Sequence, residues 1–390
     1  MEIALKYGLN PNQEFARLLI ETEPSPLKLV NGPAGYINML DAMGAWQLAR
    51  ELREATGRPG AASFKHVSPA GAAVARPLGD ALLQSQMIPP DEELSPVATA
   101  YVRARAADRM SSFGDMAAVS DTVDVSLAQV LRREVSDGII APGYEPEAVE
   151  ILRAKKGGKY CMIQVDPDYE PPQVEYRDLF GFRLEEDRNT AKVTRGILQN
   201  VVTKKKEIPD DVAESLMVAT VALKYTQSNS VCVAYDGQVI GMGAGQQSRI
   251  HCTRLCCAKA EKWFLQIHPK ALGLKFKEGL GRPERTNAVD QFVIWDELSD
   301  AEREQMLGAL TEEPAPITAE EKAEWIDRFE GVCISSDAFF PFRDSIDRAN
   351  RTNVQYILQP GGSARDDIVI EAADQYGMVM ACSGMRWFLH

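Results

Sequence analysis

Two segments of the chain follow the same order of strand, Pro-Gly turn, helix, glycine and strand. The first spans residues 138–165 and has its turn at Pro142-Gly143. The second spans residues 356–382 and has its turn at Pro360-Gly361. Each segment is a βαβ unit, which favours a parallel sheet covered by helices. The repeat therefore predicts two copies of one α/β unit.

The length of the chain agrees with two copies. Its 390 residues are about twice the size of a usual domain. We place the first α/β unit at residues 1–200 and the second at residues 201–390. The second unit contains an insertion near residues 265–332, which we expect to be helical and which is acidic and interrupted by Pro314 and Pro316.

Composition excludes several classes of protein. Hydrophobic residues make up 45% of the chain and charged residues 25%, which is ordinary for a globular protein. The net charge of -13 argues against a nucleic-acid-binding surface and a polybasic membrane anchor, although a local basic pocket can hold an anion. No apolar run reaches the roughly 18 residues that span a bilayer, and no signal peptide follows Met1. Seven scattered cysteines do not form a disulfide framework. We expect a cytoplasmic protein with reduced thiols.

A lysine and a histidine follow a predicted buried strand. Helical spacing predicts a helix over 36–56, and the small apolar run at 60–64 predicts the strand that leads into Lys65 and His66. Such a pair suits acid/base or nucleophilic chemistry. Successive strand side chains face opposite ways, so both can serve one site only if the backbone bends between or just after them, and residues 68–71 (SPAG) can supply that bend. A surface lysine beside a hydrogen-bonded structural histidine remains the alternative.

Two further segments carry weaker signals. Lys6 and Tyr7 lie on a polar loop that could hold a phosphate or be plain surface. Asp236-Gly237 predicts a hairpin turn, and glycines at 241, 243 and 245 then precede a predicted helix, whose first N-H groups can bind an anion. Their spacing lacks the G-x-G-x-x-G register of a dinucleotide site.

Four histidine and cysteine residues lie close together in the sequence, which raises the question of a zinc-binding site. They are His251, Cys252, Cys256 and Cys257. Zinc sites usually combine two separated pairs of ligands, whereas these four residues share one predicted helix. We therefore expect no metal site.

Several blocks of the sequence are long and unusual. They are YGLNP (7–11), NG (31–32), FKHVSPAG (64–71), RMSSFGD (109–115), EVSDGIIAPGY (134–144), KYTQSNSVC (224–232), GAGQQSR (243–249), SSDAFFPFRD (335–344) and RWFLH (386–390). Through these blocks the chain resembles the formyltransferase domain of the bifunctional purine-biosynthesis family, the 5-aminoimidazole-4-carboxamide ribonucleotide (AICAR) transformylases. The resemblance extends over essentially the whole chain.

The resemblance implies a reaction, a fold and an assembly. The reaction is transfer of the formyl group of 10-formyltetrahydrofolate to the 5-amino group of AICAR, which gives FAICAR and tetrahydrofolate in de novo purine (IMP) biosynthesis. The implied fold is α/β, with duplicated cytidine-deaminase-like α/β/α units that lack zinc. The implied assembly is a homodimer with active sites at the interface. The family's usual IMP cyclohydrolase domain has no counterpart here, so a separate cyclohydrolase is expected, and a stand-alone enzyme and a shortened chain both fit.

The resemblance also implies roles for individual residues. His66 would be the base that takes a proton from the acceptor amine, Lys65 would stabilise the oxyanion or protonate folate N10, and Asn229 would orient the carboxamide or the formyl oxygen. The implied AICAR contacts are Lys6, Tyr7, Gly114, Asp137, Arg249, Phe339 and Arg386. The implied folate contacts are Ile250, Asp344, Ser363 and Ala364. The terminal residues Phe388 and His390 are expected to fold into the site.

Two residues depart from the family pattern. Lys6 stands where the family usually has Arg, and Asn12 stands where it has His. A lysine keeps the positive charge but loses the bidentate fork of arginine. These departures and the missing cyclohydrolase domain leave one alternative, a catalytically silent relative that binds AICAR. A separate alternative is a zinc hydrolase or deaminase on the same fold.

Overall fold

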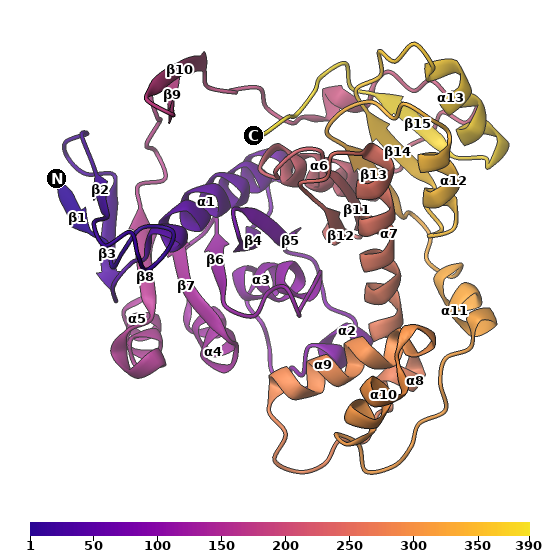
Figure 1. Cartoon of the computed structure of the whole chain (residues 1–390), viewed down its shortest axis with the longest axis horizontal. Coiled ribbons are helices and arrows are strands. Elements are labelled where there is room, and N and C mark those ends of the chain that lie inside the picture. Colours follow the sequence, from indigo (N-terminus) through magenta and orange to yellow (C-terminus); the bar gives the residue numbers. More distant parts are fainter.

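An eleven-stranded mixed sheet runs through the molecule and carries the candidate site (Figure 1). A computed structural model describes all residues, Met1–His390. The strand order is β15-β14-β13-β11-β12-β5-β4-β6-β7-β8-β3. The strands are β3 (Leu27–Asn31), β4 (Gly60–Lys65), β5 (Ser68–Val74), β6 (Asp115–Val119), β7 (Ser136–Ala141), β8 (Cys161–Val165), β11 (Val231–Tyr235), β12 (Gln238–Gly243), β13 (Cys333–Ser336), β14 (Tyr356–Gln359) and β15 (Val379–Cys382).

The two halves of the sheet repeat one pattern of strand pairing. In the first half β4 pairs antiparallel with β5 and β6, and β6, β7 and β8 run parallel. In the second half β11 pairs antiparallel with β12 and β13, and β13, β14 and β15 run parallel. The halves join where β12 pairs antiparallel with β5, at Gln238 and Ala73. The predicted α/β class is confirmed, with a sheet that is mixed and not wholly parallel.

The antiparallel junction points the two sets of parallel strands in opposite directions. The turn between β4 and β5 therefore lies at the same end of the sheet as the starts of β6, β7 and β8. The start of β11 and the ends of β13, β14 and β15 lie at this end as well. We call it the Lys65 end of the sheet. Loops from both halves are placed along this one edge.

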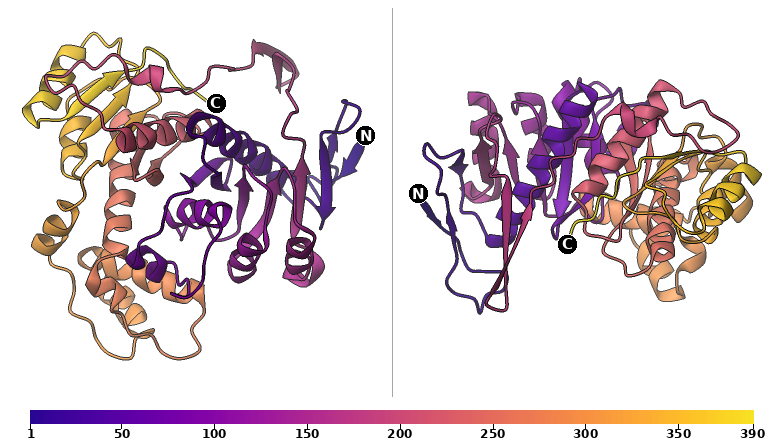
Figure 2. Two further views of the ribbon diagram at one scale, coloured as in Figure 1. Left: turned by 180° about the vertical axis from the view of Figure 1, so that it is seen from behind. Right: turned by 90° about the horizontal axis from the view of Figure 1, so that it is seen from above.

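Helices cover both faces of the sheet (Figures 1 and 2). On one face lie α1 (Tyr36–Thr56) and α6 (Asp210–Lys224), and on the other lie α3 (Pro96–Ala106), α4 (Val125–Arg133), α5 (Pro146–Arg153), α7 (Arg249–Gln266), α12 (Asp344–Asn350) and α13 (Asp366–Gln375). Alternate residues of β4 pack into the hydrophobic cores on the two opposite faces of the sheet. Ala62 and Phe64 pack with α1, whereas Ala61 packs with α3. This alternation is the period of two that a strand buried on both faces requires.

The segment between α7 and β13 is helical, as the insertion near 265–332 was predicted to be. It contains α8 (Pro269–Leu272), α9 (Arg282–Val293), the 3-10 turn Trp295–Glu297, α10 (Asp300–Leu307) and α11 (Ala319–Ile326). These helices have a small core of their own, in which Phe292, Met306 and Ile317 are buried. The short helix α2 (Asp80–Ser85) lies beside them (Figure 1).

Two hairpins lie outside the main sheet. One is formed by β1 (Glu2–Ala4) and β2 (Arg17–Leu19), and the other by β9 (Val174–Leu179) and β10 (Phe182–Asp187). The β9–β10 hairpin stands away from the body of the molecule (Figures 1 and 2). Every residue of its strands is exposed. None of the helices combines the length and the apolar character that crossing a bilayer would require.

Candidate active site

The turn after Lys65 is tighter than the sequence predicted. His66 and Val67 alone connect β4 to β5, with φ angles of 53° and 62°. Two central residues with positive φ make a type I′ hairpin turn, which Asn and Gly normally occupy. The segment 68–71, which we expected to supply the bend, is instead the first part of strand β5. The bend therefore comes at His66 itself, so the exposed imidazole lies at the tip of the hairpin beside the half-buried Lys65.

A buried carboxyl group holds this turn. Oδ1 of Asp41, on α1, accepts the backbone N-H of Val67 at 2.7 Å. Burial raises the pKa of the Asp41 carboxyl, and the hydrogen bonds from the turn together with the charge of His66 act against that rise. Asp41 is thus both the anchor of an unfavourable turn and the acidic group nearest the histidine backbone.

The Lys65 side chain lies beside the loop that precedes β6. Its Nζ donates a hydrogen bond to the carbonyl oxygen of Phe113. The neighbouring Gly114 has a φ of 77°, and a Cβ built there would lie 3.8 Å from Nζ of Lys65 and 3.8 Å from each carboxylate oxygen of Asp137. Because Gly114 has no side chain, the space between the Lys65 ammonium and the Asp137 carboxylate stays open.

Further charged groups surround Asp137. Its carboxylate pairs with Nζ of Lys156, which follows α5. Burial raises the pKa of the Cys161 thiol, at the start of β8, to about 11. The positive charges of Lys6 and Lys156 act against this rise, so Lys6 also lies near the start of β8. Lys6 and Tyr7 are exposed. The first-half group, defined as Lys6, Tyr7, Lys65, His66, Gly114 and Asp137, thus lies along β4, β6, β7 and β8 at the Lys65 end.

A cavity of about 310 Å³ opens beside Lys65 and His66. Its far wall comes from the end of β12 and from α7, with Met242 and Leu255 giving it apolar surface. Lys259 lines it too, and its Nζ lies 2.9 Å from Oδ2 of Asp108. The catalytic pair predicted from the sequence therefore faces an open space, as a substrate site requires.

A second set of predicted residues centres on a buried ion pair. Arg249, at the start of α7, pairs with Asp337, which follows β13. Its Nη2 also donates to Oδ1 of Asn229 at 3.0 Å. Oδ2 of Asp337 accepts the N-H and the hydroxyl of Ser230 at 2.9 and 3.0 Å. Because Arg249 is held by buried partners, it fixes the direction of the Asn229 amide.

The C-terminal residues fold onto this second set. The side chain of Trp387 is buried, with the residue 1% exposed. Its backbone N-H donates to the carbonyl oxygen of Asp337 at 2.9 Å. The N-H of Ser228 donates to the carbonyl of Leu389 at 2.9 Å. The exposed guanidinium of Arg386 lies 4.4 Å from the centre of the Phe388 ring. The end of the chain is therefore bound beside Asn229 and does not trail in solvent.

The residues expected to contact folate lie at the same end of the second half. Ile250 follows Arg249 on α7, Asp344 begins α12, and residues 363–364 follow β14. Phe339 and Phe342 are 42% and 53% exposed, which leaves apolar surface open beside them. The second-half group is defined as Asn229, Arg249, Ile250, Phe339, Asp344, Ser363, Ala364 and Arg386.

Within one chain the outer members of the two groups lie far apart, although Asn229, which precedes β11, is only three strand steps, or about 14 Å, from Lys65 on β4. Six steps between neighbouring strands separate β7, which carries Asp137, from β13, which Asp337 follows. At about 4.8 Å a step, the two carboxylates are about 29 Å apart along the sheet. No single ligand of the size of a nucleotide reaches from Asp137 to Phe339. The outer members of the two groups therefore cannot contact the same nucleotide in one chain.

Three residues with clear roles in this geometry were missed from the sequence. Asp41 occupies a core position of its helix, four residues before Ala45, and a carboxylate on an apolar face was a usable signal. Asp337 lies in the block 335–344 but was given no role. Nothing in the sequence around Lys156 singled it out.

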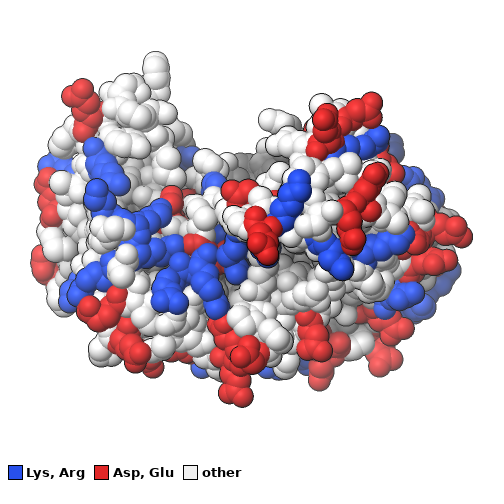
Figure 3. Space-filling view, turned by 90° about the horizontal axis from the view of Figure 1, so that it is seen from below, with Lys and Arg blue, Asp and Glu red and all other residues white.

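Lys and Arg gather locally although the chain is acidic. In the view from below they cluster on the side of the molecule that carries α4 and α5, while Asp and Glu lie mostly around them (Figure 3). Lys156 and Lys159, which follow α5, are exposed. On α7, by contrast, His251 is exposed whereas Cys252, Cys256 and Cys257 face the core.

Comparison with known proteins gives one consistent result. A family model described as the AICARFT/IMPCHase bienzyme matches residues 1–259. Proteins named bifunctional purine biosynthesis protein PurH match over 99% of the chain, with 30% identity in Roseobacter denitrificans, 31% in Paracoccus denitrificans and 29% in Cereibacter sphaeroides. The chain spans 59% of the length of each of these relatives.

Proposed function

Because the chain belongs to the AICARFT/IMPCHase bienzyme family, we propose that it transfers the formyl group of 10-formyltetrahydrofolate to the 5-amino group of AICAR. The products are FAICAR and tetrahydrofolate, and the reaction belongs to de novo purine biosynthesis. The observation that carries the proposal is the Lys65-His66 turn, which places an ammonium and an imidazole side by side at an open cavity.

His66 is the proposed general base. The acceptor amine is a weak nucleophile because its lone pair is delocalised into the imidazole carboxamide. Removal of a proton from that nitrogen during attack therefore lowers the barrier, by a factor of roughly 10² to 10⁴ in rate for a well-placed base. The type I′ turn supports this role, because it exposes the imidazole at the tip of the hairpin.

Lys65 and Asn229 are proposed to handle the charge that develops in the transition state. Attack on the formyl carbon produces an oxyanion, and expulsion of the folate N10 requires a proton. The ammonium of Lys65 suits both tasks, and the amide of Asn229, directed by Arg249, suits orientation of the carboxamide or the formyl oxygen. No step in this scheme requires a metal ion.

The remaining residues of the two groups are proposed to bind the substrates. AICAR would be held by Lys6, Tyr7, Gly114, Asp137, Arg249, Phe339 and Arg386, and the folate by Ile250, Asp344, Ser363 and Ala364. The cationic members suit a phosphate, and the exposed rings of Phe339 and Phe342 suit a flat ring system.

A homodimer with active sites at its interface is proposed to complete the site. Its main support is the separation of about 29 Å, set by the strand order, between Asp137 on β7 and the end of β13, which Phe339 and Asp344 follow. A second copy can bring its second-half group to the first-half group of its partner. We also propose that the two units are cytidine-deaminase-like, that they divide near residue 200, and that a separate IMP cyclohydrolase uses the product in the cytoplasm.

The test is an assay of tetrahydrofolate release with AICAR and 10-formyltetrahydrofolate, run beside calorimetric titration with AICAR. We expect turnover by the wild type and loss of most of kcat in His66→Ala, with the Kd for AICAR little changed. AICAR binding without any turnover would reject the transferase and leave a silent AICAR-binding protein. Normal turnover in His66→Ala would reject the assigned base.

A further inference from the structure

A buried guanidinium lies directly behind the loop that contacts Lys65. Arg105, on α3, is 3% exposed. Its Nη1 donates to the carbonyl oxygen of Ser112 at 2.7 Å and lies 3.0 Å from Oδ1 of Asp115. These two residues flank the pair 113–114, whose first carbonyl accepts the hydrogen bond from Lys65. One side chain therefore holds both ends of the segment against which the ammonium rests.

The same guanidinium ties this loop to the start of β7. Its Nη2 donates to the carbonyl oxygen of Val135 at 3.2 Å, and that oxygen also accepts the N-H of Gly114 at 2.8 Å. Its Nε donates to Oε2 of Glu134 at 3.2 Å. The loop, the strand and the guanidinium thus form one connected unit, in which the other oxygen of Glu134 remains free for a second partner.

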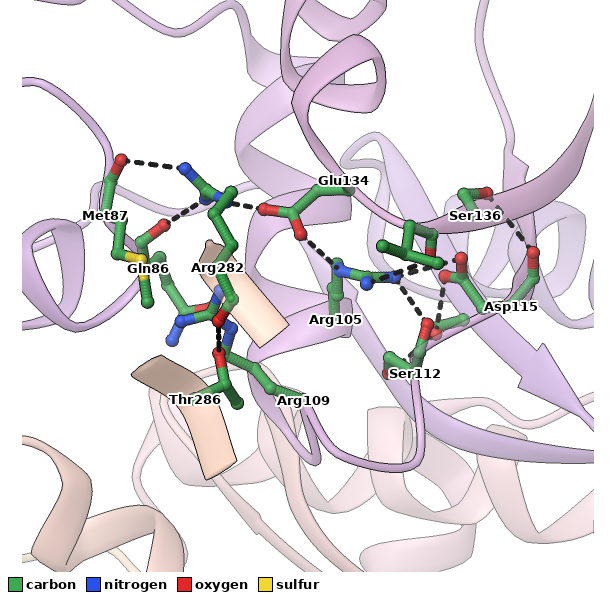
Figure 4. Close-up of polar contacts among 12 residues, drawn as sticks. Gln86, Met87, Arg105, Arg109, Ser112, Asp115, Glu134, Ser136, Arg282 and Thr286 are labelled. Atoms are coloured by element: carbon green, nitrogen blue, oxygen red, sulfur yellow. Dashed lines mark hydrogen bonds and ion pairs between the residues drawn. The ribbon is translucent and has the colours of Figure 1, made fainter. Parts of the chain in front are cut away.

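The second partner comes from the inserted helical segment. Arg282, at the start of α9, donates from Nη2 to Oε1 of Glu134 at 2.6 Å. It also donates to the carbonyl oxygens of Gln86 at 2.6 Å and Met87 at 3.2 Å. Figure 4 shows Glu134 between the guanidinium groups of Arg282 and Arg105. A chain of polar contacts therefore runs from the insertion to the loop behind Lys65.

The charges in this region make Glu134 indispensable to the arrangement. Burial opposes its ionisation, yet the positive charges of Arg105, Arg109 and Arg282 outweigh burial and lower the pKa of Glu134. Burial also lowers the pKa of Arg109 to about 10, and Nη2 of Arg109 has no hydrogen-bond partner. Glu134 thus contacts two arginines, Arg105 and Arg282, and the nearby charge of Arg109 further favours its ionised form, so a change at Arg282 leaves Arg105 to share this carboxylate alone.

We propose that Arg105 is a positioning residue for Lys65 and that the inserted segment braces it through Arg282 and Glu134. The brace limits the freedom of the 112–115 loop and so fixes the direction of the Lys65 ammonium. A displacement of a reacting group by about 1 Å can cost a factor of about 10² in rate. The kinetic part of this inference rests on the proposed function, whereas the geometry of Lys65 can be tested without it.

The experiment compares Arg282→Gln with Arg285→Gln. Arg285 lies on the same helix, but its Nε donates to the carbonyl oxygen of Leu280 at 3.2 Å and its guanidinium stacks 5.6 Å from the centre of the Phe276 ring. Both variants lose one positive charge from α9, and only the first loses the contact with Glu134. The first measurement is the rate of reductive methylation of Lys65 by formaldehyde with sodium cyanoborohydride as the hydride donor, followed by mass spectrometry. The exposed Lys159 is the internal standard.

We expect Lys65 to be methylated about threefold faster in Arg282→Gln and kcat to fall about tenfold, with the Kd for AICAR within about twofold of the wild type. Arg285→Gln should match the wild type in all three measurements. A merely structural loss would lower the melting temperature without this split between kcat and binding. Arg282→Lys restores a positive charge beside Glu134 and should bring the methylation rate most of the way back.

Equal methylation rates and equal kcat in Arg282→Gln and Arg285→Gln would overturn the inference. If Arg282→Gln does not fold, Arg105→Lys decides the matter, because it keeps the charge but loses the fork that holds the carbonyl oxygens of Ser112 and Val135. Methylation of Lys65 several-fold faster than in the wild type supports the positioning role, and a rate at the wild-type level rejects it. A wild type without formyl transfer, but with faster methylation in Arg282→Gln, would reject the proposed function and keep the positioning role.

Discussion

Mixing two inactive variants should restore formyl transfer if, as proposed, each site combines the first-half group of one chain with the second-half group of its partner. The perturbation is a pair of single substitutions, His66→Ala in the first-half group and Asn229→Ala in the second-half group. Each variant alone lacks a group proposed to take part in the reaction. We expect both to lose most of kcat as pure proteins.

The expected recovery follows from the symmetry of the dimer. Random exchange of equal amounts gives about one half of the dimers as mixed pairs, and each mixed pair has two sites. If one chain supplies the first-half group and its partner the second-half group, one site in a mixed pair receives both substitutions and the other receives none. About a quarter of the wild-type activity should therefore return.

The assay is tetrahydrofolate release after subunit exchange, with sedimentation to establish that mixed dimers form. The matched control is a mixture of His66→Ala with Lys65→Ala, two substitutions in the same group, for which every site of a mixed pair is damaged. That control should stay inactive. Mixed dimers of His66→Ala with Asn229→Ala that stay equally inactive would refute a site shared between subunits.

Three further outcomes are expected. Glu134→Gln should lower the free energy of unfolding at neutral pH by about 3 to 5 kcal/mol, because buried arginines lose their counter-charge. Burial opposes ionisation of Glu134, but those arginines lower the pKa of its carboxyl in the folded state. Its contribution to the free energy of unfolding is therefore present above the unfolded pKa of about 4.5 and is lost as the pH falls through the folded pKa. Urea titrations at several pH values should show stability falling less steeply at acid pH in Glu134→Gln than in the wild type. Trp387→Ala should cost about 3 to 5 kcal/mol in the same titrations, since the ring is 1% exposed, and a loss below about 1 kcal/mol would contradict its anchoring role. Val67→Asn should raise the free energy of unfolding by about 1 kcal/mol, because Asn tolerates a positive φ and Val does not.

Much of the local structure was predictable because short-range signals agree with the final packing. Helical spacing over 36–56 ends at a glycine, and α1 spans these residues with Gly57 in the left-handed conformation. The βαβ segments appear as β7, α5 and β8 and as β14, α13 and β15. Apolar runs in these segments are buried on both faces of the sheet, so periodicity and tertiary environment give the same answer.

The features that were not predictable depend on contacts remote in sequence. Val67 does not favour a positive φ, and the carboxylate of Asp41 that supports the turn belongs to another element. The division of the site into two groups follows from the junction of β5 with β12, which no local pattern reports. The β9–β10 hairpin is exposed along both strands and contacts the end of the chain through a hydrogen bond from Arg177 to the carbonyl oxygen of His390, which no local pattern reports.

The hairpin turn of the second half offers an internal reference for the turn at His66. Asp236 and Gly237 connect β11 to β12, as His66 and Val67 connect β4 to β5, and they also have positive φ angles of 50° and 69°. Asp-Gly is the sequence that such a turn prefers, and here Asp236 is paired with Arg76 and Arg103. The same backbone shape thus occurs once with residues suited to it and once with a β-branched valine at its second position, where a positive φ is strained. The strain at residues 66–67 therefore comes from the side chain that occupies the turn and not from the path of the backbone, so a change at Val67 alone can relieve it.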